Sequence, residues 1–191
     1  NSVTSIGAYA FRHCLSLVNV TIGNSVTSIG DYAFDSCDSL TNVTCGNSIT
    51  LIGESAFGSC TSLESINIPD SVTEIGKQAF HHCFALESIN IPDGVTEIRE
   101  YAFQGTYITD IQFNESLQYI DDYAFANTIK IDKYVIPASV KVIGNYAFEN
   151  CVGLTKITLP NSLKTIGSNA FLGCDNLNTI KFGTGLVEIG E

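Results

Sequence analysis

The chain has 191 residues, of which 45% are hydrophobic and 15% charged, and its formal net charge is −11. This composition differs from that of disordered segments, which have few apolar residues and many charges. The acidic excess argues against a nucleic-acid partner, which selects a basic surface. It also argues against docking on an anionic membrane. The sequence lacks an apolar run of the roughly 20 residues that a membrane helix needs, so we expect no direct membrane insertion.

An Ala-Phe pair recurs along the whole chain in steps of 23 residues, with one step of 22. Its phenylalanines are Phe11, Phe34, Phe57, Phe80, Phe103, Phe125, Phe148 and Phe171. An isoleucine recurs in register with the pair, at Ile6, Ile29, Ile52, Ile75, Ile98, Ile120, Ile143, Ile166 and Ile189. Residues 69–91 show one unit, PDSVTEIGKQAFHHCFALESINI. Self-similarity at a fixed period of this length is typical of solenoids.

Each unit contains a short series of predicted elements. The segment L-x-x-I-x-I, as in residues 63–68, alternates apolar and polar at its end and predicts a half-buried strand, which the following Pro or Gly ends. The next segment, S-V-T-x-I, predicts a second short strand. A Gly that permits a turn with positive φ follows it, at Gly30, Gly53, Gly76, Gly144 and Gly167. The stretch G-x-x-A-F-x-x-C has apolar residues three or four apart, which favours a short helical turn.

A single unit is too small to fold alone. Burying about eight inward side chains yields roughly 12–24 kcal/mol, whereas ordering one repeat costs about 35 kcal/mol. The units must therefore stack and share their core. We expect a curved stack of about eight coils of 22–23 residues, with a parallel β-sheet on the concave face and short strands, turns and helical turns on the other sides. Residues 1–191 then form one solenoid domain, and we expect it to be a fragment of a longer protein because both ends fall inside a repeat.

The unit I-G-x-x-A-F-x-x-C-x-x-L-x-x-I-x-I-P-x-S-V resembles the BspA-like class of leucine-rich repeats over essentially the whole chain. The resemblance implies a leucine-rich-repeat solenoid that is surface-exposed or secreted and that adheres to host proteins, other cells or matrix. It implies no catalytic residue, because the repeat motif of that family contains none. We therefore expect a non-enzymatic, monomeric, extracellular or cell-surface module without a cofactor, which binds a protein or glycan through its concave sheet. A passive spacer that displays another domain and an accessory array fused to an enzyme stay open as alternatives.

Six of the seven cysteines share one column of the repeat, namely Cys14, Cys37, Cys60, Cys83, Cys151 and Cys174. Thr106 and Thr128 replace them in the other two units, and Cys45 stands in a column of isoleucines. Stacked side chains that point in parallel have poor disulfide geometry, and threonine replaces the volume of a thiol but not its chemistry. We predict buried, unbridged thiols that pack as small hydrophobes, over a disulfide framework or a metal stripe.

Two other patterns suggest chemistry less strongly. The run His81-His82-Cys83 resembles a metal-ligand cluster, but its columns vary between units and zinc-type spacing is missing, so we expect no metal site. Three N-x-S/T sequons begin at Asn19, Asn42 and Asn114. In a eukaryotic secretory context they could carry glycans. We favour ordinary polar positions in a bacterial protein.

The exposed positions of the strands expected on the concave face differ between the two halves of the chain. Small hydroxyls and amides fill them in the first four units, whereas charge and bulk enter from Asp110 onward. We predict the partner-binding surface in coils five to seven, with Asp110, Gln112, Lys133, Val135 and Lys156 as candidate contacts. The alternative is that small polar residues merely suit a solvated sheet.

Repeats five and six depart most from the pattern. Arg99 and Asp121 replace the turn glycine, and a one-residue deletion precedes Ile108. Three tyrosines leave their usual column before Ala-Phe, and these are Tyr107, Tyr119 and Tyr134. Tyrosine is favoured at interfaces, so we interpret the irregular region as a docking patch, with ordinary repeat decay as the alternative. Tyr134 is expected to point inward, where its hydroxyl needs a partner.

Overall fold

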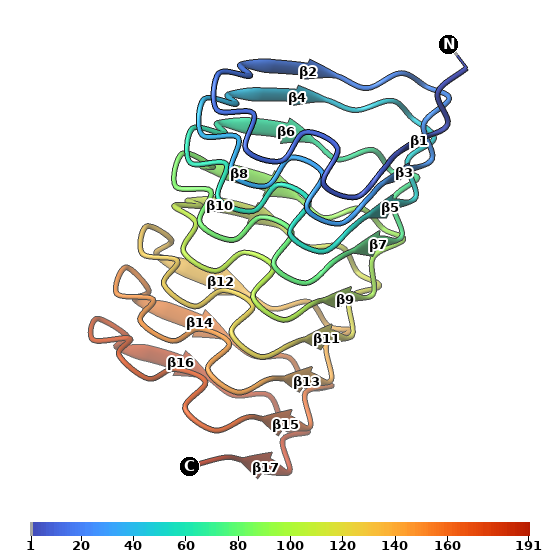
Figure 1. Cartoon of the computed structure of the whole chain (residues 1–191). Coiled ribbons are helices and arrows are strands. Elements are labelled where there is room, and N and C mark those ends of the chain that lie inside the picture. The colour runs from blue at the N-terminus through green and yellow to red at the C-terminus, as the bar shows by residue number, and fades with distance from the viewer. Residues whose placement is uncertain (1) are drawn as a thin grey trace.

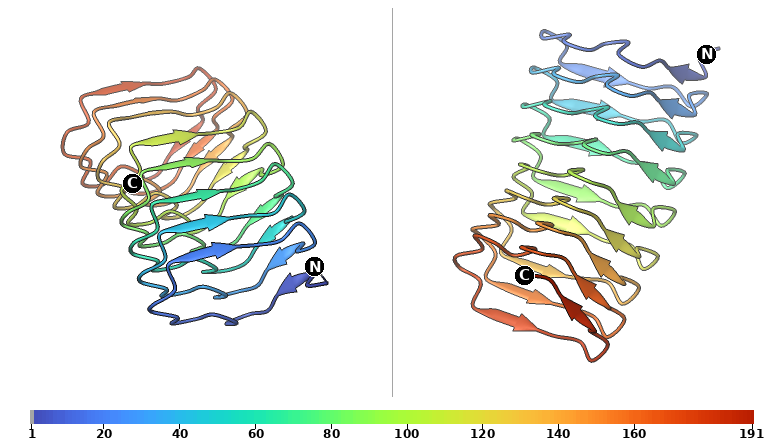
Figure 2. Two further views of the ribbon diagram at one scale, coloured as in Figure 1. Left: turned by 90° about the horizontal axis from the view of Figure 1, so that it is seen from above. Right: turned by 60° about the horizontal axis from the view of Figure 1, so that its bottom comes forward.

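The computed structural model describes residues 2–191 as a stack of coils, one repeat to a coil, with the two termini at opposite ends (Figures 1 and 2). Each coil contributes a three-residue strand to one row and a two-residue strand to another. The first row comprises β2 (Asn19–Thr21), β4 (Asn42–Thr44), β6 (Ser65–Asn67), β8 (Ser88–Asn90), β10 (Asp110–Gln112), β12 (Lys133–Val135), β14 (Lys156–Thr158) and β16 (Thr179–Lys181). We number the coils one to eight by these strands, and we call their exposed surface the long-strand face.

The second row comprises β1 (Ser5–Ile6), β3 (Ser28–Ile29), β5 (Leu51–Ile52), β7 (Glu74–Ile75), β9 (Glu97–Ile98), β11 (Tyr119–Ile120), β13 (Val142–Ile143), β15 (Thr165–Ile166) and β17 (Glu188–Ile189). Paired strands in both rows run parallel and lie one repeat apart, as Asn42 and Ser65 do. The expected solenoid of parallel strands is confirmed. The expected single sheet is wrong, because the long strands form three sheets, β2-β4-β6, β8-β10 and β12-β14-β16. The second row is broken once, between β7 and β9.

The repeated phenylalanines form a ladder through the middle of the stack. Consecutive rings are nearly parallel, with centroids 5.2 to 5.6 Å apart. The rings from Phe34 to Phe148 are at most 1% exposed, whereas Phe11 in the first coil is 44% exposed. One hydrophobic core therefore runs along the stack, and each coil is covered by its two neighbours.

The stretch before each phenylalanine forms consecutive β-turns, and the expected helical turn is wrong. The Ala33 N–H donates to the Gly30 carbonyl at 3.2 Å, which closes the first turn. A second turn follows, in which the Asp35 N–H donates to the Tyr32 carbonyl at 3.2 Å. Tyr32 has a φ of 56° and Ser36 a φ of 57°, and left-handed residues that recur in this way in each coil are incompatible with a right-handed helix. Residues 2–191 contain no helix of the length and apolarity that crossing a membrane requires.

The recurrent glycine serves close approach between coils, and the expected positive φ is wrong. Within residues 2–191, only Gly105 and Gly173 among the glycines have positive φ. A Cβ on Gly76 would lie 2.5 Å from the carbonyl carbon of Gly53, the equivalent glycine of the preceding coil. Real Cβ atoms are almost never that close to backbone, so the column needs glycine wherever the coils pack tightly.

Coils five and six lack this glycine, and the second row of strands is disturbed there. In the regular part, the Gly76 N–H donates to the Ile52 carbonyl at 2.8 Å. Arg99 makes no equivalent backbone bond to Ile75 within the described chain, and its guanidinium instead pairs with Glu74 at 2.9 Å. Partial burial and the neighbouring Glu97 raise the pKa of Asp121 to about 6. The row is therefore broken at Arg99, between coils four and five, whereas Asp121 keeps the equivalent bond, its N–H donating to the Ile98 carbonyl at 2.9 Å.

Candidate functional site

The five candidate residues all lie exposed on the long-strand face, as predicted from the alternation of the strands. Lys133 pairs with Lys156 across β12 and β14. Asp110 and Gln112 belong to β10, which pairs only with β8. The structure therefore divides the candidate set between two sheets, and the break between β10 and β12 runs through its middle.

The break between β10 and β12 is a real separation of the strands. No Cα atom of β10 lies within 8 Å of a Cα atom of β12, whereas paired strands are about 4.8 Å apart. Figure 1 shows this spacing as wider than that between any other neighbours in the row. In the coils on either side, the residue after the long strand bonds to the next coil. The Ile91 N–H donates to the Gln112 carbonyl at 3.0 Å, and the Ile136 N–H donates to the Thr158 carbonyl at 3.2 Å. Phe113 has the same position in coil five. Within residues 2–191, its N–H makes no bond to coil six.

Two aromatic rings account for the separation. Phe113 stands in the inward column of Ile68 and Ile91, and Tyr134 stands in a column of aliphatic residues. The Tyr134 ring packs 5.5 Å from that of Phe125 and 4.8 Å from that of Phe148. The Phe113 ring meets that of Phe125 edge-on at 5.8 Å. The rings of Phe113 and Tyr134 therefore lie between coils five and six, on the side of the long strands.

The opposite side of coils five and six stays closed. The Phe103 N–H donates to the Ala124 carbonyl at 2.9 Å, and the Gly105 N–H to the Ala126 carbonyl at 2.8 Å. Strands β9 and β11 are also paired there. Coils five and six therefore separate only on the long-strand face.

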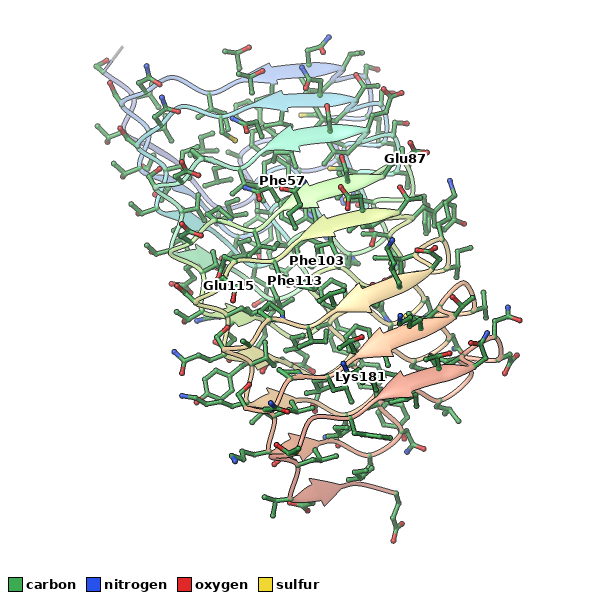
Figure 3. All side chains as sticks on the ribbon, turned by 180° about the vertical axis from the view of Figure 1, so that it is seen from behind. Phe57, Glu87, Phe103, Phe113, Glu115 and Lys181 are labelled. Atoms are coloured by element: carbon green, nitrogen blue, oxygen red, sulfur yellow. The ribbon has the colours of Figure 1, made fainter. Side chains whose placement is uncertain are left out.

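The separation holds a cleft of about 370 Å³. Its lining residues are Thr109, Asp110, Ile111, Phe113, Glu115, Ile131, Asp132, Lys133, Tyr134, Val135 and Pro137. The ring of Tyr134 is buried at the floor, and the acidic side chains are exposed at the rim. Three carboxylates and one ammonium group line the cleft, which leaves two net negative charges. Figure 3 shows Phe113 within this gap and Glu115 toward one end of it.

A family match accounts for the repeated unit. The family model described as BspA type Leucine rich repeat region matches the chain in six copies, over residues 1–109 and 73–191. The chain belongs to this family. It is similar to the solved structure of a leucine-rich repeat protein from T. pallidum, with 30% identity over 97% of this chain and 77% of that one, at a TM-score of 0.64.

A second similar structure is that of a leucine-rich cell surface protein from Faecalibacterium prausnitzii. It is 29% identical over 95% of this chain and 64% of that one, at a TM-score of 0.46. No functionally curated protein matches the sequence. The fold expected from the resemblance is confirmed, and the chain is a module of a family of non-enzymatic repeat proteins.

Phe113 and Tyr134, the two rings that separate β10 from β12, depart from the regular BspA-type unit, and their effect on the sheet was not predicted from the sequence. The prediction that Tyr134 points inward is confirmed by its exposed fraction of 1%. Its hydroxyl has no hydrogen-bond partner within residues 2–191, and burial raises its pKa well above the usual range. Tyr107 and Tyr119 do not line the cleft. A phenylalanine in an isoleucine column was the signal for Phe113.

The run His81-His82-Cys83 does not converge on a common point. The Cys83 thiol donates to the Phe57 carbonyl at 3.1 Å inside the core. The His82 ring stacks on Phe84 outside it, with centroids 5.7 Å apart. No group of three His, Cys, Asp or Glu side chains within the described part of the chain could hold a metal ion.

The three sequons differ in accessibility. Asn19 and Asn42 lie exposed on β2 and β4. Asn114 is only 5% exposed, and its amide nitrogen donates to the Pro92 carbonyl at 2.6 Å and to the Val95 carbonyl at 2.8 Å. A glycan on Asn114 is therefore incompatible with this fold.

The column cysteines pack as the sequence predicts, with one exception. Five of them are buried, and each thiol donates to the phenylalanine carbonyl of the preceding coil at 3.0 to 3.2 Å. Cys14 is only half-buried, and its predicted burial is wrong because no described coil covers it. Thr106 and Thr128 bond to carbonyls of their own coil instead.

Alkylation of the folded and the unfolded protein is expected to give different counts. A thiol reacts as its thiolate, and burial raises the pKa of Cys83 to about 12 and that of Cys45 to about 11. Contact with the neighbouring thiol lowers the pKa of Cys37 and Cys174, but both side chains are at most 9% exposed and stay out of reach of the reagent. At pH 8 the folded protein should therefore react only at Cys14. In urea without reductant, mass spectrometry should find all seven thiols modified. A bridge between neighbouring coils would contradict the packing.

Proposed function

We propose that this protein is a non-enzymatic adhesion module of the cell surface or of the secreted fraction, and that it binds a protein or glycan through the long-strand face of coils five to seven. The observation that carries the proposal is the coincidence of two independent features. Charge and bulk enter the exposed strand positions at Asp110. The sheet opens into the cleft between β10 and β12 at the same place.

The long-strand face of coils five to seven has exposed side chains beside a cleft, which suits the binding of a partner. Val135 is 68% exposed and lies on β12 two residues after Lys133, opposite Thr158 of β14. It borders both the cleft and a shallow groove of about 460 Å³ toward coil eight. Phe182, 52% exposed, lies at the far side of that groove. Because the surface is anchored on a stacked core, binding orders few additional groups. The charges of Asp110, Lys133 and Lys156 then adjust rate and specificity.

A uniform spacer is the competing function, and coils one to four have the small polar strand residues expected of one. Membership of the BspA-type family supports the extracellular setting and the binding of proteins. The absence of a catalytic motif from the repeat supports a non-enzymatic role, and we propose that the module acts as a monomer without a cofactor.

Charge reversal at Lys133→Glu and Lys156→Glu tests the proposal on an array of immobilised matrix proteins and glycans. The matched control is Lys141→Glu with Lys164→Glu, which are also one repeat apart and exposed but lie beside the second row of strands. We expect the first pair to weaken binding at least about tenfold, equivalent to about 1.4 kcal/mol. Melting temperatures should change little for both pairs, because all four side chains are exposed and the bonds of Lys141 to Gln118 and of Lys164 to Gly185 lie at the surface.

The proposal fails if the control pair weakens binding as much as the test pair. It also fails if binding tolerates the test pair and is lost when back-face residues such as Arg12 or His82 are changed. An array on which the wild-type protein binds nothing favours the spacer.

A further inference from the structure

The two walls of the cleft carry backbone groups that a continuous sheet would use. In neighbouring coils, the Thr109 N–H donates to the Glu87 carbonyl at 2.8 Å. The Thr155 N–H donates to the Asp132 carbonyl, also at 2.8 Å. The equivalent N–H of Asp132 makes no bond to Thr109 in residues 2–191, and that of Phe113 makes none to Val135. Both edges facing the gap are therefore unpaired, a feature that templates the pairing of another strand.

The gap is wider than the spacing of two paired strands. One strand inserted between β10 and β12 requires two spacings, or about 9.6 Å. The observed separation exceeds 8 Å between all Cα atoms of the two strands. The rings of Phe113 and Tyr134 thus hold the two edges beyond the distance at which they could bond to each other, and both edges are left free to bond to an inserted chain.

We propose that the cleft binds an extended peptide segment of a partner protein, which inserts between β10 and β12 as an additional strand. This inference rests on the proposed function and names the class of partner. Backbone hydrogen bonds on both sides supply affinity that is independent of side chains, as in other cases of β-augmentation.

The lining defines the side chains of that segment. Its inward-facing residues must be small, because the rings of Tyr134 and Phe113 fill the space beneath the gap. Asp110 and Asp132 lie where the strands begin, and Glu115 follows the end of β10. Basic residues at the two ends of the segment are therefore complementary in charge. A second copy of this chain is the competing occupant.

The test uses the synthetic peptide acetyl-Lys-Thr-Ala-Val-Ala-Lys-amide and residue-resolved amide hydrogen exchange by NMR. With the peptide at saturation, exchange at the Phe113 and Asp132 amides should slow at least about tenfold. A peptide with both alanine nitrogens methylated keeps the side chains but loses two donors. It should bind about thirty-fold more weakly, the loss expected for two net hydrogen bonds. A version with glutamate in place of both lysines should also bind more weakly.

The variant Phe113→Ile with Tyr134→Ile restores the aliphatic columns and should let β10 pair with β12. We expect it to protect the Phe113 amide without peptide and to lose peptide binding. Should this variant fail to fold, the methylated peptide still decides the matter on the wild-type protein.

Unchanged exchange at Phe113 and Asp132 in the presence of the peptide overturns the inference, as does equal binding of the methylated peptide. Concentration-dependent dimerisation that protects the same amides assigns the gap to a second copy and also overturns it. The proposed function is judged separately. Suppose that a partner from the array needs Lys133 and Lys156 but binds the Phe113→Ile, Tyr134→Ile variant as well as the wild type. The proposed function is then supported and strand insertion is rejected. If the peptide protects the Phe113 and Asp132 amides but no such partner is found on the array, strand insertion is supported and the proposed function is rejected.

Discussion

Replacing Phe103 by alanine is expected to lower the free energy of unfolding by about 3–5 kcal/mol, the range for removing a buried phenylalanine ring. The side chain is fully buried, and its ring lies 5.5 Å from those of both Phe80 and Phe125. Because a solenoid is held together by contacts between neighbouring coils, the cavity weakens two interfaces at once. Urea unfolding followed by circular dichroism measures the change.

The control for this variant is Phe11→Ala, in the same column of the first coil. That ring is 44% exposed and stacks on one neighbour, Phe34, at 5.2 Å. We expect a loss below about 1.5 kcal/mol, since much of its surface stays in water in the folded state. Equal losses for the two variants would mean that the phenylalanine ladder is not the core of the stack.

Replacing Gly76 by alanine is expected to destabilise the protein by about 1–3 kcal/mol, although only one methyl group is added. Its Cβ would lie 2.5 Å from the Gly53 carbonyl carbon and 2.6 Å from the Glu54 nitrogen, and both contacts are with backbone that cannot rotate away. Either the coils separate or the chain shifts. Thermal melting by circular dichroism reports the loss.

Gly7→Ala is the matched control, because Gly7 has the same place in the first coil and nothing lies within 4 Å of a Cβ built there. Its melting point should change little, corresponding to within about 0.5 kcal/mol. A comparable loss at Gly7 would show that the glycine is needed for its backbone conformation rather than for contact between coils.

The period of the sequence predicts the stack and its core well. A side chain that recurs every 23 residues in a solenoid must fall on the same column, so the buried places of Phe57, Ile75 and Cys83 follow directly. The alternation in each strand likewise predicts that Lys133 and Val135 face solvent and that Tyr134 does not.

The backbone conformation at each recurring position is harder to predict from the sequence. Apolar residues three or four apart are compatible with a helical turn and with two successive β-turns, and the left-handed φ of Tyr32 distinguishes them only in the structure. A recurrent glycine such as Gly76 is compatible with positive φ and with close approach, and spacing alone does not decide between the two.

The opening of the sheet was the hardest feature to predict. Phe113 and Tyr134 are visible as substitutions in aliphatic columns. Whether such rings tilt into free space or force strands apart depends on packing with Phe125 of coil six and Phe148 of coil seven. The candidate residues were therefore placed on the correct face, whereas the cleft that divides them was not foreseen.

Amide hydrogen exchange of the free protein tests most directly whether coils five and six are open on the long-strand face. The Ile91 and Ile136 amides donate within sheets on either side of the gap, and they should be protected. The Phe113 and Asp132 amides face the gap and should exchange at least about a hundredfold faster, since they open without breaking a backbone hydrogen bond. Equal protection of all four amides would mean that β10 and β12 are paired, and the cleft and the proposals that depend on it would have to be abandoned.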